Sequence, residues 1–160
     1  MRRLGSYLGL RFFLALVLGI IWTPATFAKT TLIDDAGTQS LEPAVSLRWN
    51  SLEPSRRAAD NLLIGNTTIR VHLNVLPWLH RQGRIYLTLP AQAPGPIGAV
   101  WNTRGTLRPG QLRSGNRVLL YAGPISTPFL EDVLTLQYSI DAALVRRAFP
   151  VNLRFEMDED

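Results

Sequence analysis

The chain of 160 residues contains no cysteine. This absence excludes disulfides, thiolate ligands for a metal, a thiol nucleophile and a lipid-modified cysteine. Histidine is almost as scarce, because His72 and His80 are the only two. A zinc site needs several suitable ligands brought together, and the sequence around these histidines supplies no third one. We therefore expect no metal and no other cofactor.

Sequence motifs of the common enzyme classes are also absent. No G-x-S-x-G turn and no phosphate-binding glycine loop occurs. The most suggestive acids are Glu131 and Asp132, since glycoside hydrolysis uses two carboxylates. Neighbouring residues on a strand point to opposite sides, however, so these two cannot flank one substrate bond. We interpret them as charges that keep a strand end from pairing with a neighbour, and we expect no catalytic residues.

The first 28 residues have the three-part layout of a secretory signal peptide. Arg2 and Arg3 provide a positive start, the segment Phe12–Trp22 is apolar, and Ala28 offers a small residue for cleavage before Lys29. A membrane anchor is one alternative, but it needs about 20 apolar residues, roughly twice the length of this run. A twin-arginine signal, suggested by the paired arginines, is the other. The sequence predicts export through the Sec pathway to the periplasm, the cell surface or the extracellular space.

Removing this leader changes the charge balance. The whole chain has a net charge of +5, from 17 basic and 12 acidic residues. Arg2, Arg3 and Arg11 lie in the leader, so that 17 − 3 = 14 basic residues remain and the net charge falls to +2. A charge this small, without runs of basic residues, does not indicate nucleic-acid binding.

The stretch from Thr67 to Pro90 shows the clearest periodicity. Apolar residues alternate with polar ones on both sides of a seven-residue segment, Pro77 to Gly83. A period of two is typical of a strand with one buried face, and Pro77 cannot donate to a sheet ladder. The pattern predicts a β-hairpin with this segment as its connection, in which Gly83 takes a positive φ.

Five further strands are predicted, at Ala44–Trp49, Ala99–Thr103, Arg117–Ala122, Leu134–Ile140 and Phe149–Met157. Arg117–Ala122 is apolar on both faces, which favours an interior strand. Pro150 indicates either that the last strand lies at an edge or that this proline is among the strand's first residues. Glycine and proline separate the strands, and no long helix is predicted. The chain is therefore expected to be all-β: about seven strands in a single antiparallel sandwich of the immunoglobulin type, with a small β-barrel as the alternative.

The domain organisation follows from this pattern. Residues 1–28 are the predicted signal peptide, 29–43 a flexible arm, 44–157 the β-sandwich domain and 158–160 a solvated acidic tail. Trp49 and Trp101 fall on strands and are expected in the core.

The connection of the predicted hairpin combines a tryptophan with cationic side chains. Trp78 lies near Arg81 and Arg84, and Tyr86 is expected on the outer face of its strand. Tryptophan, tyrosine and arginine carry much of the energy of protein interfaces. We therefore predict a partner-binding site made of Trp78, Arg81, Arg84 and Tyr86. In the alternative, Trp78 folds back to cap one end of the sandwich and the arginines are solvated.

Together these patterns predict an exported, non-enzymatic protein that acts through its surface, as a cell-envelope or appendage component or as a partner-binding module. Exported sandwiches of this size include fimbrial subunits, their chaperones and carbohydrate-binding modules, which is an analogy of class without a shared motif. The expected partner is another envelope protein or an acidic or glycan ligand, with no nucleic acid and with the membrane only during export. Self-association through an edge strand is left open. The alternative is a secreted protein that binds or cleaves glycans through Trp78, Tyr86 and Glu131.

Overall fold

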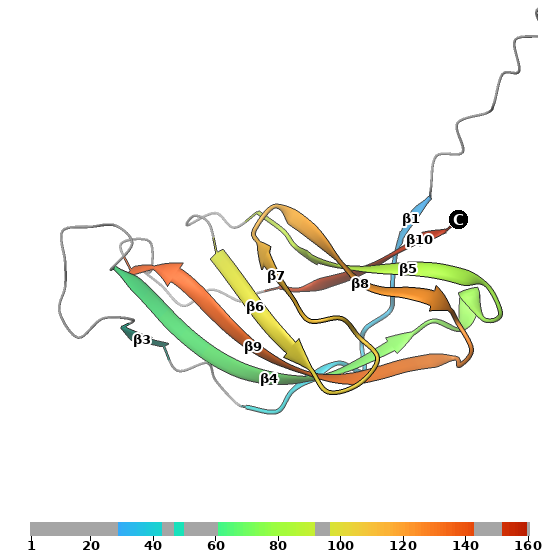
Figure 1. Ribbon diagram of the computed structural model, residues 1–160, viewed down its shortest axis with the longest axis horizontal. Coiled ribbons are helices and arrows are strands. Elements are labelled where there is room, and N and C mark those ends of the chain that lie inside the picture. Colours follow the sequence, from blue (N-terminus) through green and yellow to red (C-terminus); the bar gives the residue numbers. More distant parts are fainter. Residues whose placement is uncertain (1–28, 43–46, 50–60, 92–96, 143–151, 160) are drawn as a thin grey trace, which may run out of the picture.

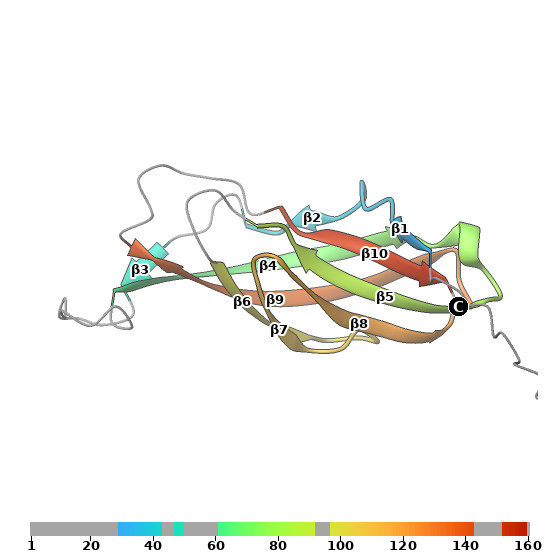
Figure 2. The ribbon, with the colours of Figure 1, turned by 90° about the horizontal axis from the view of Figure 1, so that it is seen from above.

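The computed structural model describes residues 29–42, 47–49, 61–91, 97–142 and 152–159. These residues form ten strands and almost no helix, which confirms the all-β prediction. The strands pair antiparallel in two separate sheets, which lie as two layers over a shared apolar core (Figure 1, Figure 2). Two such layers are the arrangement of a sandwich rather than of the small barrel. The predicted signal peptide, with Ala28, lies outside the described residues.

The four-stranded sheet has the order β1 (Thr30–Leu32), β10 (Arg154–Glu159), β5 (Gln82–Leu89) and β8 (Asn116–Pro124). The six-stranded sheet has the order β2 (Gln39–Ser40), β4 (Leu62–Asn74), β9 (Phe129–Asp141), β6 (Ile97–Thr103) and β7 (Gly110–Arg113), and β3 (Leu47–Trp49) also pairs with β4. The predicted strands correspond to β3–β6 and β8–β10, whereas β1, β2 and β7 were not predicted. Within the described ranges, no helix is long and apolar enough to cross a membrane.

The predicted hairpin is wrong, although both of its strands exist. β4 pairs along its length with β9, while β5 pairs with β10 and β8 in the other sheet. The buried faces were predicted correctly, since both strands bury their alternating apolar residues. A period of two identifies the face of a strand that is buried, but not the strand that lies beside it. The connection therefore crosses from one sheet to the other across the end of the core.

The connection between β4 and β5 is held by backbone hydrogen bonds and by close packing against β10. It contains a 3-10 helix, η2 (Leu76–Trp78), and its backbone bonds to the β8–β9 connection, where His80 N donates to Ile125 O at 2.8 Å. The residue with a positive φ is His80, at 65°, so the prediction of a positive φ at Gly83 is wrong. Glycine is needed at position 83 for a different reason, because a Cβ atom there would lie 2.8 Å from the Sδ atom of Met157.

Both ends of the described chain belong to the sheets. The prediction of a flexible arm at 29–43 is wrong for its described part, because β1 pairs with β10, β2 pairs with β4, and Ile33 between them is 2% exposed. The prediction of a solvated tail at 158–160 is also wrong for its described residues. β10 continues to Glu159, and Asp158 is 9% exposed. β1 and β2 thus cover the edges of β10 and β4, and the backbone groups along those edges are hydrogen-bonded.

The positions of two strands within their sheets also differ from expectation. β8 was expected inside a sheet and is the last strand of the four-stranded one. For β10, Pro150 indicated either an edge position or a proline among its first residues; β10 lies between β1 and β5, so the edge alternative is wrong. Phe155 and Met157 are buried, as the alternation predicts. Trp101 is in the core as expected, but Trp49 is 57% exposed on the short strand β3, so that prediction is wrong.

Candidate functional site

Trp78, the proposed anchor of the partner-binding site, is a core residue. It is 6% exposed and ends the 3-10 helix over the end of the sandwich. Its Nε1 atom donates a hydrogen bond to Glu159 Oε1 at 3.0 Å. The prediction that Trp78 offers an exposed apolar surface is wrong, and the structure has the capping arrangement considered as the alternative.

Glu159 links the connection to the end of β10. While one oxygen accepts the bond from Trp78, the other lies 3.3 Å from Nη2 of Arg81, whose side chain is half exposed. The hydrogen bond from Trp78, together with the charge of Arg81, lowers the pKa of Glu159 below its usual value. Arg81 therefore forms an ion pair within the chain, between the β4–β5 connection and β10, rather than a contact reserved for a partner.

Tyr86 lies on the outer face of the four-stranded sheet beneath an arginine. The guanidinium carbon of Arg117 lies 3.9 Å from the centre of the Tyr86 ring, a cation–π contact between β8 and β5. The same guanidinium reaches β10, with its Nε atom 3.4 Å from Glu156 Oε2. Arg117, which was not among the predicted site residues, therefore joins three neighbouring strands.

Asp158 extends this polar cluster to β1. Its Oδ1 atom accepts hydrogen bonds from Arg117 Nη2 at 2.9 Å and from Thr30 Oγ1 at 2.7 Å. Burial raises the pKa of Asp158, but the hydrogen bonds from Arg117 and Thr30, with the charge of Arg84, outweigh burial and hold the pKa below its usual value. The four predicted residues therefore belong to two internal networks, Trp78 and Arg81 with Glu159, and Tyr86 and Arg84 around Asp158.

A surface pocket of about 340 Å³ lies between β1 and the connection. Its lining brings together Lys29 and Arg81 as cations and Asp34 and Glu159 as acids, beside Leu32 and Trp78. The volume is at the low end for a small-molecule site. Charges of both signs give no clear preference for an anionic or a cationic ligand.

The acids Glu131 and Asp132 point to opposite sides of β9, as predicted, but their interpretation as edge charges is wrong. β9 lies between β4 and β6. Asp132 is 7% exposed and accepts backbone hydrogen bonds from Leu107 N at 2.9 Å and Arg104 N at 3.3 Å. Its carboxylate thus holds the turn after β6 against the sheet, a structural role.

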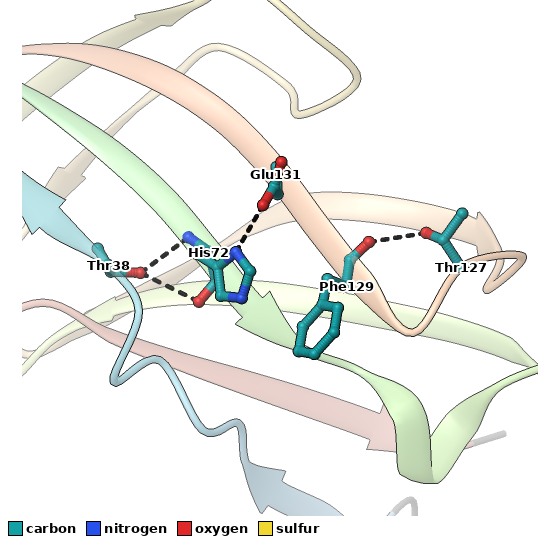
Figure 3. Close-up of polar contacts among 5 residues, drawn as sticks. All are labelled: Thr38, His72, Thr127, Phe129 and Glu131. Atoms are coloured by element: carbon teal, nitrogen blue, oxygen red, sulfur yellow. Dashed lines mark hydrogen bonds and ion pairs between the residues drawn. The ribbon is translucent and has the colours of Figure 1, made fainter.

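Glu131 belongs to a cluster on the outer face of the six-stranded sheet (Figure 3). Its Oε1 atom lies 2.6 Å from Nδ1 of His72, and the imidazole ring stacks on Phe129 with ring centres 4.7 Å apart. Thr38, which precedes β2, bonds the backbone of His72. His72 is half-buried, with one side of its ring packed against Phe129. Only the β4–β9 register places His72 opposite Glu131, and sequence alone does not give that register.

Chemically, these clusters bind loops and strands to one another. In the described parts of the chain, no group of three or more His, Cys, Asp or Glu side chains is placed to hold a metal ion. The lowered pKa values belong to Asp158 and Glu159, whose partners are internal. The raised pKa values belong to Arg117, through its hydrogen bond with Asp158, and to Tyr138, through burial. The strongest concentration of polar contacts is where β1, β10 and the connection meet, which makes this end of the four-stranded sheet the candidate functional region.

Comparison with known proteins gives no match for this chain: no family model matches it, and neither a curated protein nor a solved structure is significantly similar to it.

Proposed function

We propose that this chain is an exported, non-enzymatic protein that acts through its surface in the cell envelope, as an envelope or fimbria-like appendage component or as a partner-binding module. The observation that carries the proposal is the leader pattern and its position. The predicted cut between Ala28 and Lys29 leaves a single residue before β1 begins at Thr30. A cut there would remove the leader and leave the folded strands intact.

We further infer that the sandwich is immunoglobulin-like. In immunoglobulin domains the second and fifth strands pair in one sheet, while the third and sixth pair in the other. Here β4 pairs with β9 and β6 lies on the other side of β9, while β5 pairs with β10 in the second sheet. These pairings support the correspondence of β4, β5, β6, β9 and β10 with the second to sixth strands of that fold. Domains of this type commonly bind other proteins through their faces and edges.

The glycan alternative has weaker support. A stacking platform for a sugar needs an aromatic face that is open to solvent. Trp78 is buried, and Arg117 covers the ring of Tyr86. An array of envelope glycans, combined with an assay for released sugar, tests this alternative directly; saturable binding would favour a carbohydrate module, and turnover would contradict the non-enzymatic proposal.

Export is tested by expressing the chain with a carboxyl-terminal tag in a bacterial host and separating the cell compartments. We expect a product outside the cytoplasm whose amino-terminal residue is Lys29. Leu16→Arg breaks the apolar run of the leader and should keep the uncut chain in the cytoplasm, whereas Thr38→Ser, outside the leader, should not. An uncut cytoplasmic product from the unsubstituted chain would overturn the proposal.

A further inference from the structure

The outer edge of β10 is covered by a strand from the far end of the chain. In an immunoglobulin sheet this position belongs to the strand that follows in sequence. Here β1 occupies it, and the hydrogen-bonded residues Thr30 and Asp158 are 128 positions apart. Figure 2 shows β1 lying along β10 at the end of the molecule where the chain enters the described fold. Because β1 and β10 are so far apart in the sequence, no short connection forces the β1 that pairs with β10 to come from the same copy of the chain.

β1 fits the edge through one deep anchor and a short ladder. Its three residues pair with β10 in the register Thr30↔Asp158, Thr31↔Met157 and Leu32↔Glu156. The next residue, Ile33, donates its N–H to Phe155 O at 2.9 Å and buries its side chain completely. A segment of this kind carries its whole recognition pattern within a few residues, so an identical segment from another chain fits equally well.

Two features of β1 weaken its hold on the edge of β10. The hydroxyl of Thr31 is buried without a hydrogen-bond partner. Leu32, on the outer face, is 62% exposed. A buried hydroxyl without a partner weakens the segment that contains it, while the vacant edge of β10 would still require a strand.

The segment after β1 is suited to act as a hinge. Residues 34–38 are mainly polar and turn through two short-range bonds, from Ala36 N to Asp34 Oδ1 at 3.1 Å and from Thr38 N to Asp35 O at 2.7 Å. The segment also bonds to β4, from Asn74 N to Asp34 O at 2.9 Å and from His72 N to Thr38 Oγ1 at 3.0 Å, so exchange opens these bonds as well. Once they open, the polar groups can be solvated and the segment extends away from its own body. Exchange of terminal elements through such hinges is an economical route to dimers.

We propose that β1 exchanges between two copies of this chain, so that Ile33 and β1 of one copy complete the four-stranded sheet of the other. The occupant is a second copy because the edge matches this strand in register, in its inward isoleucine and in the Thr30–Asp158 hydrogen bond. The proposal deepens the proposed function by naming the partner, and it rests on that function only for the free chain end that the predicted cut would create beside β1.

The test uses single cysteines, because the chain has none of its own. Leu32 and Glu156 face each other across the β1–β10 ladder, between the bonds from Ile33 N and Glu159 N, so they form a non-hydrogen-bonded pair. Such pairs have Cα atoms about 4.5 Å apart, which suits a disulfide. Leu32→Cys and Glu156→Cys are made separately as the full chain, purified in the form that the host produces, mixed, unfolded in guanidinium, refolded together and oxidised.

We expect a disulfide-linked dimer containing one chain of each variant, with a yield that rises with protein concentration. Its yield should exceed severalfold that of the control mixture of Leu32→Cys with Val100→Cys, which is exposed on the other sheet. Adding Ile33→Ala to the Leu32→Cys chain removes most of the anchor and should lower the yield. A yield no greater than that of the control mixture at any concentration would overturn the proposal.

Native mass spectrometry of the unsubstituted chain, refolded in the same way, is a second measurement that does not depend on the variants refolding. Dimers that increase with concentration are expected, and monomers at every concentration would also overturn the exchange. Both measurements use purified protein, so their outcome is independent of the export test. A cytoplasmic, uncut chain that still exchanged β1 would contradict the proposed function alone.

Discussion

Asp132 and Glu159 are carboxylates on strands of opposite sheets, and each holds a loop against its sheet. Asp132 is buried and accepts backbone N–H groups of Arg104 and Leu107. The side chain of Glu159 is 26% exposed and binds the side chains of Trp78 and Arg81. Every residue but proline offers a backbone donor, whereas a side-chain donor depends on residue identity. Asp132 therefore holds the turn after β6 through main-chain donors, whereas Glu159 holds the β4–β5 connection through particular side chains, in addition to the backbone bonds of that connection such as His80 N to Ile125 O.

The largest effect on stability is expected at the β4–β5 connection, where Glu159 binds the side chain of Trp78. Trp78→Ala empties a packed site and removes a donor from Glu159, and comparable losses cost about 3–5 kcal/mol. The exposed Trp49 provides the matched control, since Trp49→Ala should stay within about 0.5 kcal/mol of the parent. Urea unfolding followed by circular dichroism measures both. Equal effects would show that Trp78 is not packed and would restore it as a candidate anchor.

A direct comparison of the two carboxylates is expected to give the next largest effect. The N–H groups of Arg104 and Leu107 point to separate oxygens of Asp132, so Asp132→Asn turns an amide N–H₂ toward one of these donors. Leaving a buried donor without an acceptor costs about 1–3 kcal/mol in unfolding free energy. Glu159→Gln keeps an acceptor for Trp78 and loses only an exposed ion pair, so its melting temperature should fall less. If the two variants melt at the same temperature, the proposed difference between the main-chain contacts of Asp132 and the side-chain contacts of Glu159 is wrong.

Acid should weaken the end of β10. The pKa values of Asp158 and Glu159 are lower in the folded protein than their ordinary values of 3.8 and 4.5. Both carboxylates therefore stabilise the fold above these ordinary values, and the contribution is lost as the pH falls through the lowered, folded-state values. Thermal unfolding between pH 7 and pH 3 should show this loss, and the Asp158→Asn, Glu159→Gln double variant should show a shallower one. An unchanged slope in the double variant would assign the acid sensitivity to other groups.

Two threonines on β1 repeat the comparison on a smaller scale. Thr30 has a partner for its hydroxyl in Asp158, while the buried hydroxyl of Thr31 has none. Thr31→Val should raise the free energy of unfolding by about 0.5–1 kcal/mol, and Thr30→Val should lower it by about 1 kcal/mol. Chemical unfolding of both variants measures the two signs. The same sign for both would mean that β1 does not occupy the edge of β10.

The sequence was sufficient for the fold class and for the buried faces of the long strands. Alternation marked β4, β5, β9 and the residues Phe155 and Met157 of β10 correctly, because burial of one face imposes a period of two. It did not give the neighbours of a strand. The same alternation suits a β5 that pairs with β4 and a β5 that lies in the opposite sheet. The burial of Trp78, which lets the connection cross the end of the core, distinguishes the two arrangements, and it is visible only in the three-dimensional structure.

The candidate region was harder to predict because its contacts are long-range. Thr30, Trp78 and Arg117 reach Asp158 and Glu159 from 41 to 128 residues away, and local sequence carries no trace of such pairs. Acids at a chain end resemble a solvated tail, and the short, mostly polar β1 resembles a loop. The role of Asp132 was misassigned for a similar reason, because its partners are backbone groups of a turn 25 and 28 residues away.

The central place of β10 sets an order in time for the folding of a newly made chain. The strands of the six-stranded sheet end with β9 at Asp141, so that sheet can form while the rest of the chain is still emerging from the machinery that makes or exports it. The four-stranded sheet must wait, because β1 and β5 are both joined through a strand that is completed only at Glu159. During this interval the apolar side of the finished sheet stays partly uncovered, which is when a chain is most prone to aggregate. The last described strand to be synthesised is thus the one that ends this exposure.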